Sequence, residues 1–314
     1  KFDGHKIVIN YNKNKLDIKG SGNFSFEDKT DNISYQITKD KDSFSFNLKT
    51  KLKNNSLLLN ILDYEKKEGL NSLVLIKGNY SNKKKLRLNF ISLEESDNKI
   101  LIKGLDLSKR FKIIDIKNLS INLKNSKKVS NKLQLKKDNS NFFVEGEIFD
   151  ASKIINNIME SDEDSSSIFE NFNSKINIRI NQTYIDEVNY INNLNGHINY
   201  KDNKINDLEL ASVFSNGKKI NLSIKTNNNL ETITRLFSSY PKPLIRRYNF
   251  IKGFEEGYLD LNSTKRDGVS KSLLIIDNFK VKEVPIFAKL LSLASLQGIA
   301  DLLTGEGIRF TDFE

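Results

Sequence analysis

Side chains that commonly carry out catalysis or bind metals are few in this sequence and lie far apart. The two histidines, His5 and His197, stand in different strand-like segments, and neither has the spacing of a metal ligand or a catalytic triad. There is no cysteine, which excludes disulfides, thiolate metal sites and cysteine nucleophiles. We therefore expect no metal site and no cofactor, and predict that the protein is not an enzyme.

Two short motifs resemble binding loops but lack essential parts. The acidic stretch SDEDSSS at 161–167 has neither the alternating ligands nor the glycine of a calcium loop, so we expect a solvated loop. Gly305 and Gly307 form GxG without a third glycine, a preceding parallel strand or a following helix. A dinucleotide site is therefore not expected.

The sequence is basic, with 50 Lys and Arg against 40 Asp and Glu. The lysines are spread along the chain and are not interleaved with aromatic residues as in a stacking platform, so we expect no nucleic-acid partner. A solvated outer face accounts for most of them. Those that flank the apolar rows are expected to attract lipid headgroups only by charge: Lys85, Arg87, Lys175 and Arg179.

Apolar and polar residues alternate over most of the chain, which is typical of strands with one apolar and one solvated face. In one such segment Leu86, Leu88 and Phe90 alternate with polar residues. We predict that one continuous apolar face is lined by the following residues: Phe24, Phe26, Phe44, Phe46, Leu86, Leu88, Ile176 and Ile178.

Helices are predicted in two places within the second half. Asp150 or Ser152 is placed to cap a helix near 151–160. A second helix near 229–239 is predicted to start at Asn228, with Glu231 completing a capping box, and to stop at Pro241.

A third helical region near 285–304 is almost entirely apolar. Pro285 suits a first helical position, and only a narrow polar stripe remains around Lys289. Because Lys289, Gly298 and Asp301 lie inside it, we interpret it as a buried or interfacial helix pair and not as a membrane span. An ordinary core helix is the alternative. As an end helix or gate against the sheet it would use Phe287, Leu290, Leu291, Ala294 and Leu302.

The predicted fold is mainly β: a long, curved antiparallel sheet with an open groove and a few short helices, including the apolar pair near the C-terminus. Residues 1–149 form one segment of this groove, and 150–314 continue the same sheet with inserted helices. No segment resembles a linker. The first residue is Lys1, without a signal peptide or a membrane-spanning run, so we interpret the chain as part of a longer protein.

The region from Asp150 to the end resembles the C-terminal region of AsmA-like envelope proteins, in the YhdP branch. The residues that carry this are NLETITRLFSSY (229–240), GFEEGYLDLNST (253–264) and 273–314, with DASKIINNIMES (150–161) resembling a helix that precedes the later strands. The most specific part runs without gaps from Pro285 to Phe310. Residues 1–149 share only the strand pattern, and the chain is poorer in Gly and Arg than the family.

The resemblance implies a lipid-transfer protein of the Gram-negative periplasm, tethered to the inner membrane by a segment outside this sequence. Its partners would be phospholipid and the membranes at the ends of the full-length protein. The strand pattern agrees, because a sheet with one apolar face and few helices must curl to bury that face, and the resulting slot can hold acyl chains. Each buried methylene is worth roughly 0.8 kcal/mol.

An alternative from a different class is a structural or adhesin-like β-solenoid whose apolar face is simply its core. The two differ in whether the inward residues fill the space between them or leave a continuous gap. The sequence leaves both open.

Overall fold

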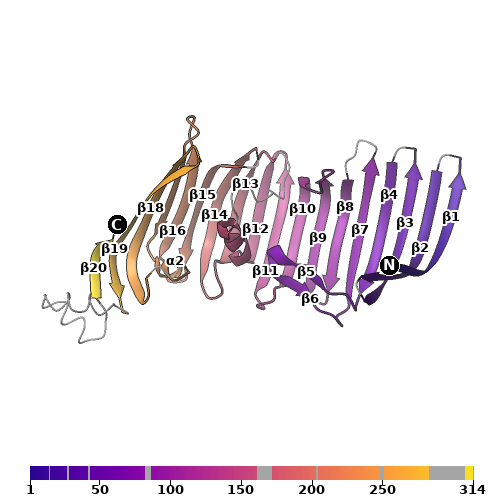
Figure 1. Cartoon of the computed structure of the whole chain (residues 1–314), viewed down its shortest axis with the longest axis horizontal. Helices are drawn as coiled ribbons and strands as arrows, with labels where there is room; N and C mark the ends of the chain where they lie inside the picture. The colour runs from indigo at the N-terminus through magenta and orange to yellow at the C-terminus, as the bar shows by residue number, and fades with distance from the viewer. Residues whose placement is uncertain are drawn as a thin grey trace. The chain divides into compact units, whose positions relative to one another are not determined.

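The computed structural model is mainly β, as the alternating sequence predicts, and Figure 1 shows its strands side by side within each unit. It describes residues 1–13, 15–26, 28–41, 43–81, 86–160, 172–202, 204–247, 251–282 and 308–313, with the backbone alone at 157–160. Eighteen strands belong to one sheet, and β5 (Leu57–Leu59) and β6 (Tyr64–Lys66) form a separate hairpin around the 3₁₀ turn η1 (Asn60–Leu62). The chain divides into a first compact unit, 1–187 with 200–204, and a second, 188–199 with 205–314.

The strands of the first unit are long and almost consecutive. They are β1 (Phe2–Asn12), β2 (Lys15–Phe26), β3 (Lys29–Asp40), β4 (Ser43–Leu52), β7 (Ser72–Ser81), β8 (Leu86–Glu95), β9 (Asn98–Leu107), β10 (Ile113–Lys124), β11 (Ser130–Asp138), β12 (Asn141–Asp150) and β13 (Ser174–Tyr184). Each pairs with the next along the chain, except that β4 pairs with β7 across the β5–β6 hairpin.

These registered pairs are antiparallel up to β12, whereas β12 and β13 are parallel. A parallel neighbour needs a crossover connection, and the chain between these strands contains the predicted first helix, α1 (Ser152–Glu160). The sheet is therefore mixed at this point. The predicted segments 1–149 and 150–314 also pair here, inside the first unit.

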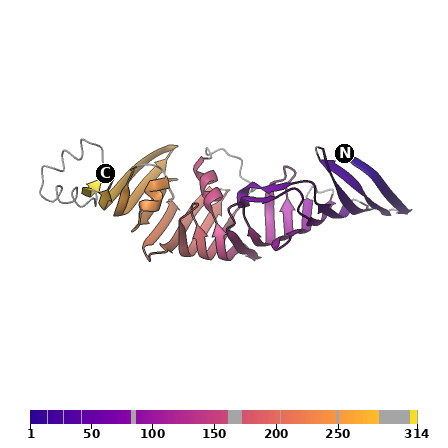
Figure 2. The same ribbon diagram turned by 90° about the horizontal axis from the view of Figure 1, so that it is seen from below.

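Helix α1 forms where the sequence predicts it, and its cap is identifiable. The Oδ1 atom of Asp150 accepts a hydrogen bond from the backbone N–H of Ser152, whereas the buried Ser152 hydroxyl has no partner among the described residues. Figure 2 shows α1 and the β5–β6 hairpin on the same side of the first unit's sheet. They are connected through Asp63, whose carboxylate lies 3.8 Å from the Lys153 ammonium.

The second unit is also built of strands, and the registered pairs from β15 to β20 are antiparallel. They are β14 (Tyr190–Lys201, ending in the first unit), β15 (Lys204–Phe214), β16 (Lys219–Thr226), β17 (Thr232–Ser238), β18 (Phe254–Arg266), β19 (Val269–Val281) and β20 (Ile308–Phe313). Registered pairs join β15 through β20 in chain order. One short helix, α2 (Lys242–Arg247), is inserted before β18.

The predicted helix near 229–239 is wrong: its core is strand β17. Glu231, predicted to complete a capping box with Asn228, instead helps to close the β16–β17 hairpin. The Asn227 side chain accepts hydrogen bonds from the N–H groups of Asn229 and Glu231 and donates one to the Glu231 carboxylate. Leu230 has φ 58° and is exposed. The β-branched run from Thr232 to Thr234 then favours a strand.

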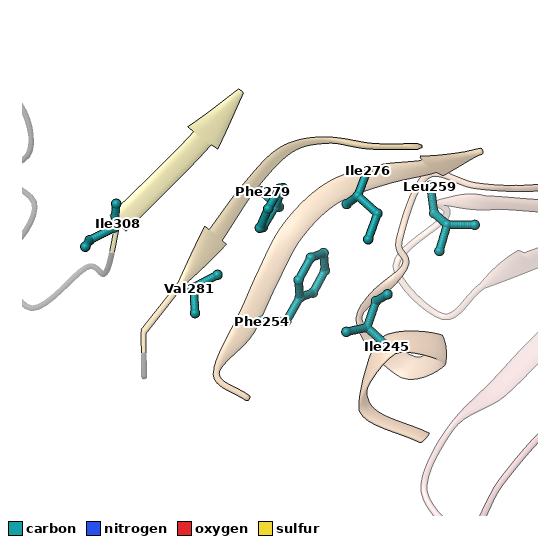
Figure 3. Packing of buried hydrophobic residues seen from close by; sticks show 7 residues of the cluster. All are labelled: Ile245, Phe254, Leu259, Ile276, Phe279, Val281 and Ile308. Carbon is teal, nitrogen blue, oxygen red and sulfur yellow. The ribbon is translucent and has the colours of Figure 1, made fainter. Parts of the chain in front are cut away.

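The core of the second unit lies between α2 and strands β18–β20, as Figure 3 shows. Three phenylalanine rings stack across it, Phe254 on Phe279 at 5.3 Å and Phe279 on Phe310 at 5.1 Å between centroids. Ile245 brings α2 onto this core, and Ile276 is completely buried. The predicted apolar helix pair near 285–304, with its proposed gate residues, lies outside the described residues.

Candidate functional site

The predicted lining residues of the first unit all project from one face of its sheet. Directly paired residues of neighbouring strands share a face, so the register can be followed from strand to strand. Phe24 pairs with Asp31 on β3. Asp31, Ile33 and Ile37 lie an even number of residues apart and so share one face of β3, and Ile37 pairs with Phe46 on β4. Following the pairs to β13 brings Ile176 and Ile178 onto this face. We call it the apolar face.

Register shifts interrupt the strict alternation in four registered strand pairs of the first unit, and one of them is a β-bulge on β8. On β8, Leu88 pairs with Gly78 whereas Phe90 pairs with Lys77, so the intervening residue is unpaired. The expectation that Phe90 shares a face with Leu86 and Leu88 is therefore wrong. Phe90 lies on the opposite, polar face, where the Lys77 ammonium stands 5.9 Å from its ring centroid.

The N-terminal part of the apolar face is open. Phe26 is 67% exposed and Phe44 is 37% exposed, and the apolar residues of the edge strand β1 are exposed as well. Phe24, Phe46 and Leu86 are only half-buried. A contiguous apolar surface of this kind on a folded unit is typical of a surface that binds a partner or a ligand.

The central part of the apolar face is filled by its own side chains. Leu105 and Ile116 are each 8% exposed and Phe142 is 2% exposed. Phe172 closes over them, with its ring centroid 5.4 Å from that of Phe142. The predicted lining residues on β8 and β13 that pack against this cluster are Leu88 and Ile176.

Tyr200 completes the filled segment from the far side of Phe172. The two ring centroids are 5.4 Å apart, in an edge-to-face arrangement. Burial raises the pKa of Tyr200 above its ordinary value, as expected for a phenol in apolar surroundings. This part of the face therefore has the character of an ordinary protein core.

Aromatic rings lie flat on the open segment because glycines leave room beneath them. A Cβ atom at Gly78 would stand 2.6 Å from Cζ of Phe46, its partner on β4. At Gly20 a Cβ atom would stand 2.3 Å from the ring of Tyr35. The floor of the open segment is thus aromatic and smooth, with no side chain at the glycine positions.

The β5–β6 hairpin covers one end of the apolar face and is held there by buried polar groups. Asp31 accepts hydrogen bonds from the backbone N–H groups of Lys53, Asn54 and Asn55 at 2.8–3.0 Å. Burial acts to raise the pKa of Asp31, but these hydrogen bonds outweigh it and leave the pKa below its ordinary value. The carboxylate is therefore a fixed anchor for the chain that leads into the hairpin.

Two residues of β6 reach the same end. Lys66 is fully buried and donates to the carbonyl oxygens of Lys53 and Asn55, and burial lowers its pKa. Tyr64 donates to the Glu95 carboxylate at 2.9 Å. The sequence did not predict that the β5–β6 hairpin covers this end of the apolar face, because a lysine and a carboxylate carry no sign of burial until their partners are known.

The histidines and flanking cations make local contacts. His5 donates from Nε2 to the Asn23 carbonyl at 2.9 Å, and His197 donates to Asp207 at 2.6 Å. Arg87 forms two hydrogen bonds of 2.6 Å to Asp106, and these raise its pKa. Lys175 and Arg179, the other two described flanking cations, lie on the polar face, because they pair by register with Asn141 and Glu145. Lys85 lies outside the described residues.

No group of three or more metal-ligating side chains occurs in the described part of the chain, and no helix there is long and apolar enough to cross a membrane. Comparison with protein-family models, curated proteins and solved structures gave no match. The apolar face of the first unit is therefore the candidate site on its geometry alone.

Proposed function

We propose that the open segment of the apolar face, on strands β1–β4, β7 and β8, binds the acyl chains of phospholipid. The observation that carries the proposal is the register, which places a continuous row of half-buried and exposed apolar side chains on one face while the other face is polar. About ten fully buried methylenes would contribute roughly 8 kcal/mol at ~0.8 kcal/mol each, and a chain covered on one side only contributes less.

The same geometry requires no catalytic residue. Acyl chains in an apolar row meet chemically equivalent positions along it, so a lipid can move with small barriers. The resemblance of residues 150–314 to AsmA-like envelope proteins would place this activity in the periplasm, within a longer protein tethered to the inner membrane. Both family and location stay predictions, as does a headgroup role for the flanking cations.

A structural β-solenoid is the second candidate, and the filled cluster around Phe142 favours it for strands β9–β13. Both candidates fit one molecule if the filled segment supports the open one. Whether the protein binds lipid or is only structural then depends on the open segment alone.

The test is mass spectrometry of lipid extracted from the detergent-free protein, comparing Leu48→Glu with Ser45→Glu. Leu48 lies on the apolar face opposite Tyr35 and Ile76, whereas Ser45 lies on the polar face of the same strand. We expect phospholipid with the unaltered protein and with Ser45→Glu, and little with Leu48→Glu. Equal lipid content in both variants, or none in the unaltered protein, would refute the proposal.

A further inference from the structure

The polar face of strands β1–β4 and β7 is hollowed and lined by lysines. One hollow of about 530 Å³ and an adjoining one of about 470 Å³ share four lining residues. The shared residues are Lys6, Ser21, Ser34 and Lys49. Lys19, Lys77 and Lys51 complete the basic lining, and we call the whole the lysine groove.

The residues shared by the two hollows are polar, and Val8 and Leu75 add apolar side chains to the larger hollow. Lys6 pairs with Ser21, Ser21 with Ser34, and Ser34 with Lys49, so two lysines face each other across two serines. Three strand spacings separate their backbones, about 14 Å. Gln36 and Asn47 lie in the next row. The floor thus offers hydroxyl and amide groups between two sets of ammonium groups.

The positive charge of the lysine groove is largely unneutralised. Lys19 lies 4.0 Å from Asp17, and none of the other four lysines has a carboxylate within ion-pair distance among the described residues. A hollow of about 660 Å³ in the second unit is different, because two of its three cations, Lys242 and Arg309, pair with its carboxylates Glu255 and Glu256, and only Lys218 has no carboxylate within ion-pair distance among the described residues. Uncompensated like charge around a concavity attracts an anion.

We propose that the lysine groove binds a sugar that carries several phosphate groups. Phosphates would contact the lysines while sugar hydroxyls meet the serine, glutamine and asparagine side chains of the floor. The two connected hollows suit an extended ligand rather than a single ion. This inference concerns the face opposite the acyl-chain site, and it stands whether or not that site binds lipid.

Nucleic acid fits the lysine groove less well. Binding of single strands relies on exposed aromatic rings on which bases stack. Tyr35 is the one aromatic residue among those lining the two hollows, and its ring packs over the Gly20 position on the opposite face. The groove therefore offers charge and hydrogen bonds without a stacking platform.

The test is isothermal titration of the protein with glucose 1,6-bisphosphate, a soluble sugar that carries two phosphate groups and free hydroxyl groups, in 50 mM salt. We expect the triple variant Lys6→Gln, Lys49→Gln, Lys51→Gln to weaken binding at least about tenfold, and Lys49→Gln alone about threefold. The matched control is Lys99→Gln, Lys132→Gln, Lys225→Gln, which removes equal charge from lysines that pair with Glu94, Glu147 and Glu209. Circular dichroism checks that each variant is folded.

Three outcomes would overturn the proposal. The first is no measurable binding by the unaltered protein at 50 mM salt. The second is equal weakening in the control, which would mean that net charge and not the groove is recognised. The third is tighter binding of a single-stranded oligonucleotide with the same lysine dependence, which would make the groove a nucleic-acid surface.

Discussion

Truncating a phenylalanine on the apolar face should cost very different amounts of stability in its filled and open segments. Phe142 is 2% exposed and contacts Phe172, so Phe142→Ala leaves a cavity and should lower the unfolding free energy by about 3–5 kcal/mol. Phe44 is 37% exposed. Phe44 is therefore about 63% buried, and this fraction of the ~2.5 kcal/mol for a fully buried side chain gives a loss of unfolding free energy of roughly 1.5 kcal/mol for Phe44→Ala. No cavity contribution is added, because solvent fills the space at an open site.

The assay is native-state hydrogen exchange followed by mass spectrometry on peptides from β12 and β4, with urea unfolding as a second measure. Local exchange separates the two segments, which a single global transition would not. Equal costs at the two positions would refute the division into a filled and an open segment. A cost below about 1 kcal/mol for Phe142→Ala would show that the central cluster is not packed.

Three further predictions concern other parts of the structure. Gly78→Ala should destabilise the first unit by about 1–3 kcal/mol, because the new methyl group meets the Phe46 ring and the Arg87 carbonyl oxygen, each 2.6 Å away; an unchanged urea midpoint would contradict this. The folded-state pKa of Asp31 is lowered, so the stability that this carboxylate contributes should be complete above the unfolded pKa of about 3.9 and be lost as pH falls through the folded value. Hydrogen exchange of residues 53–66 should therefore speed up in acid, and Asp31→Asn should remove this dependence on pH. Ile276→Ala should lower the unfolding free energy of the second unit by about 2–5 kcal/mol, since Ile276 is fully buried, and should therefore speed proteolysis of the folded protein; an unchanged proteolysis rate would contradict this.

The strand pattern of the first unit was predictable because burial on one face imposes a period of two that local sequence carries directly. The position of Phe90 was not, since a bulge changes the face of every later residue and leaves no distinctive local signal on β8. Strand β17 was misassigned because Asn228 and Glu231 have the three-residue spacing of a capping box, whereas Glu231 in fact bonds to Asn227 in a tight turn. The following β-branched residues should have decided in favour of a strand.

Helix α2 was also indicated by the sequence, but Pro241 was assigned to the end of a helix and not to its start. The N–H of Ile245 bonds to the Pro241 carbonyl oxygen, which places the proline at the start of α2. Proline is favoured at a helix N-terminus, where its missing N–H is not needed. The β5–β6 hairpin at Lys66 had no comparable signal, because its hydrogen bonds depend on how the chain folds back onto the end of the apolar face.

The acyl-chain proposal is tested most directly by photocrosslinking along β4, with a benzophenone amino acid placed at each position from 43 to 48 and phospholipid vesicles as the lipid source. The register predicts crosslinks at Phe44, Phe46 and Leu48 and few at Ser43, Ser45 and Asn47, because the two sets point to opposite faces. A label at Phe142 in the filled segment should give little product. Crosslinking that is uniform along β4, absent from it, or as strong at Phe142 as at Phe46 would contradict the proposal.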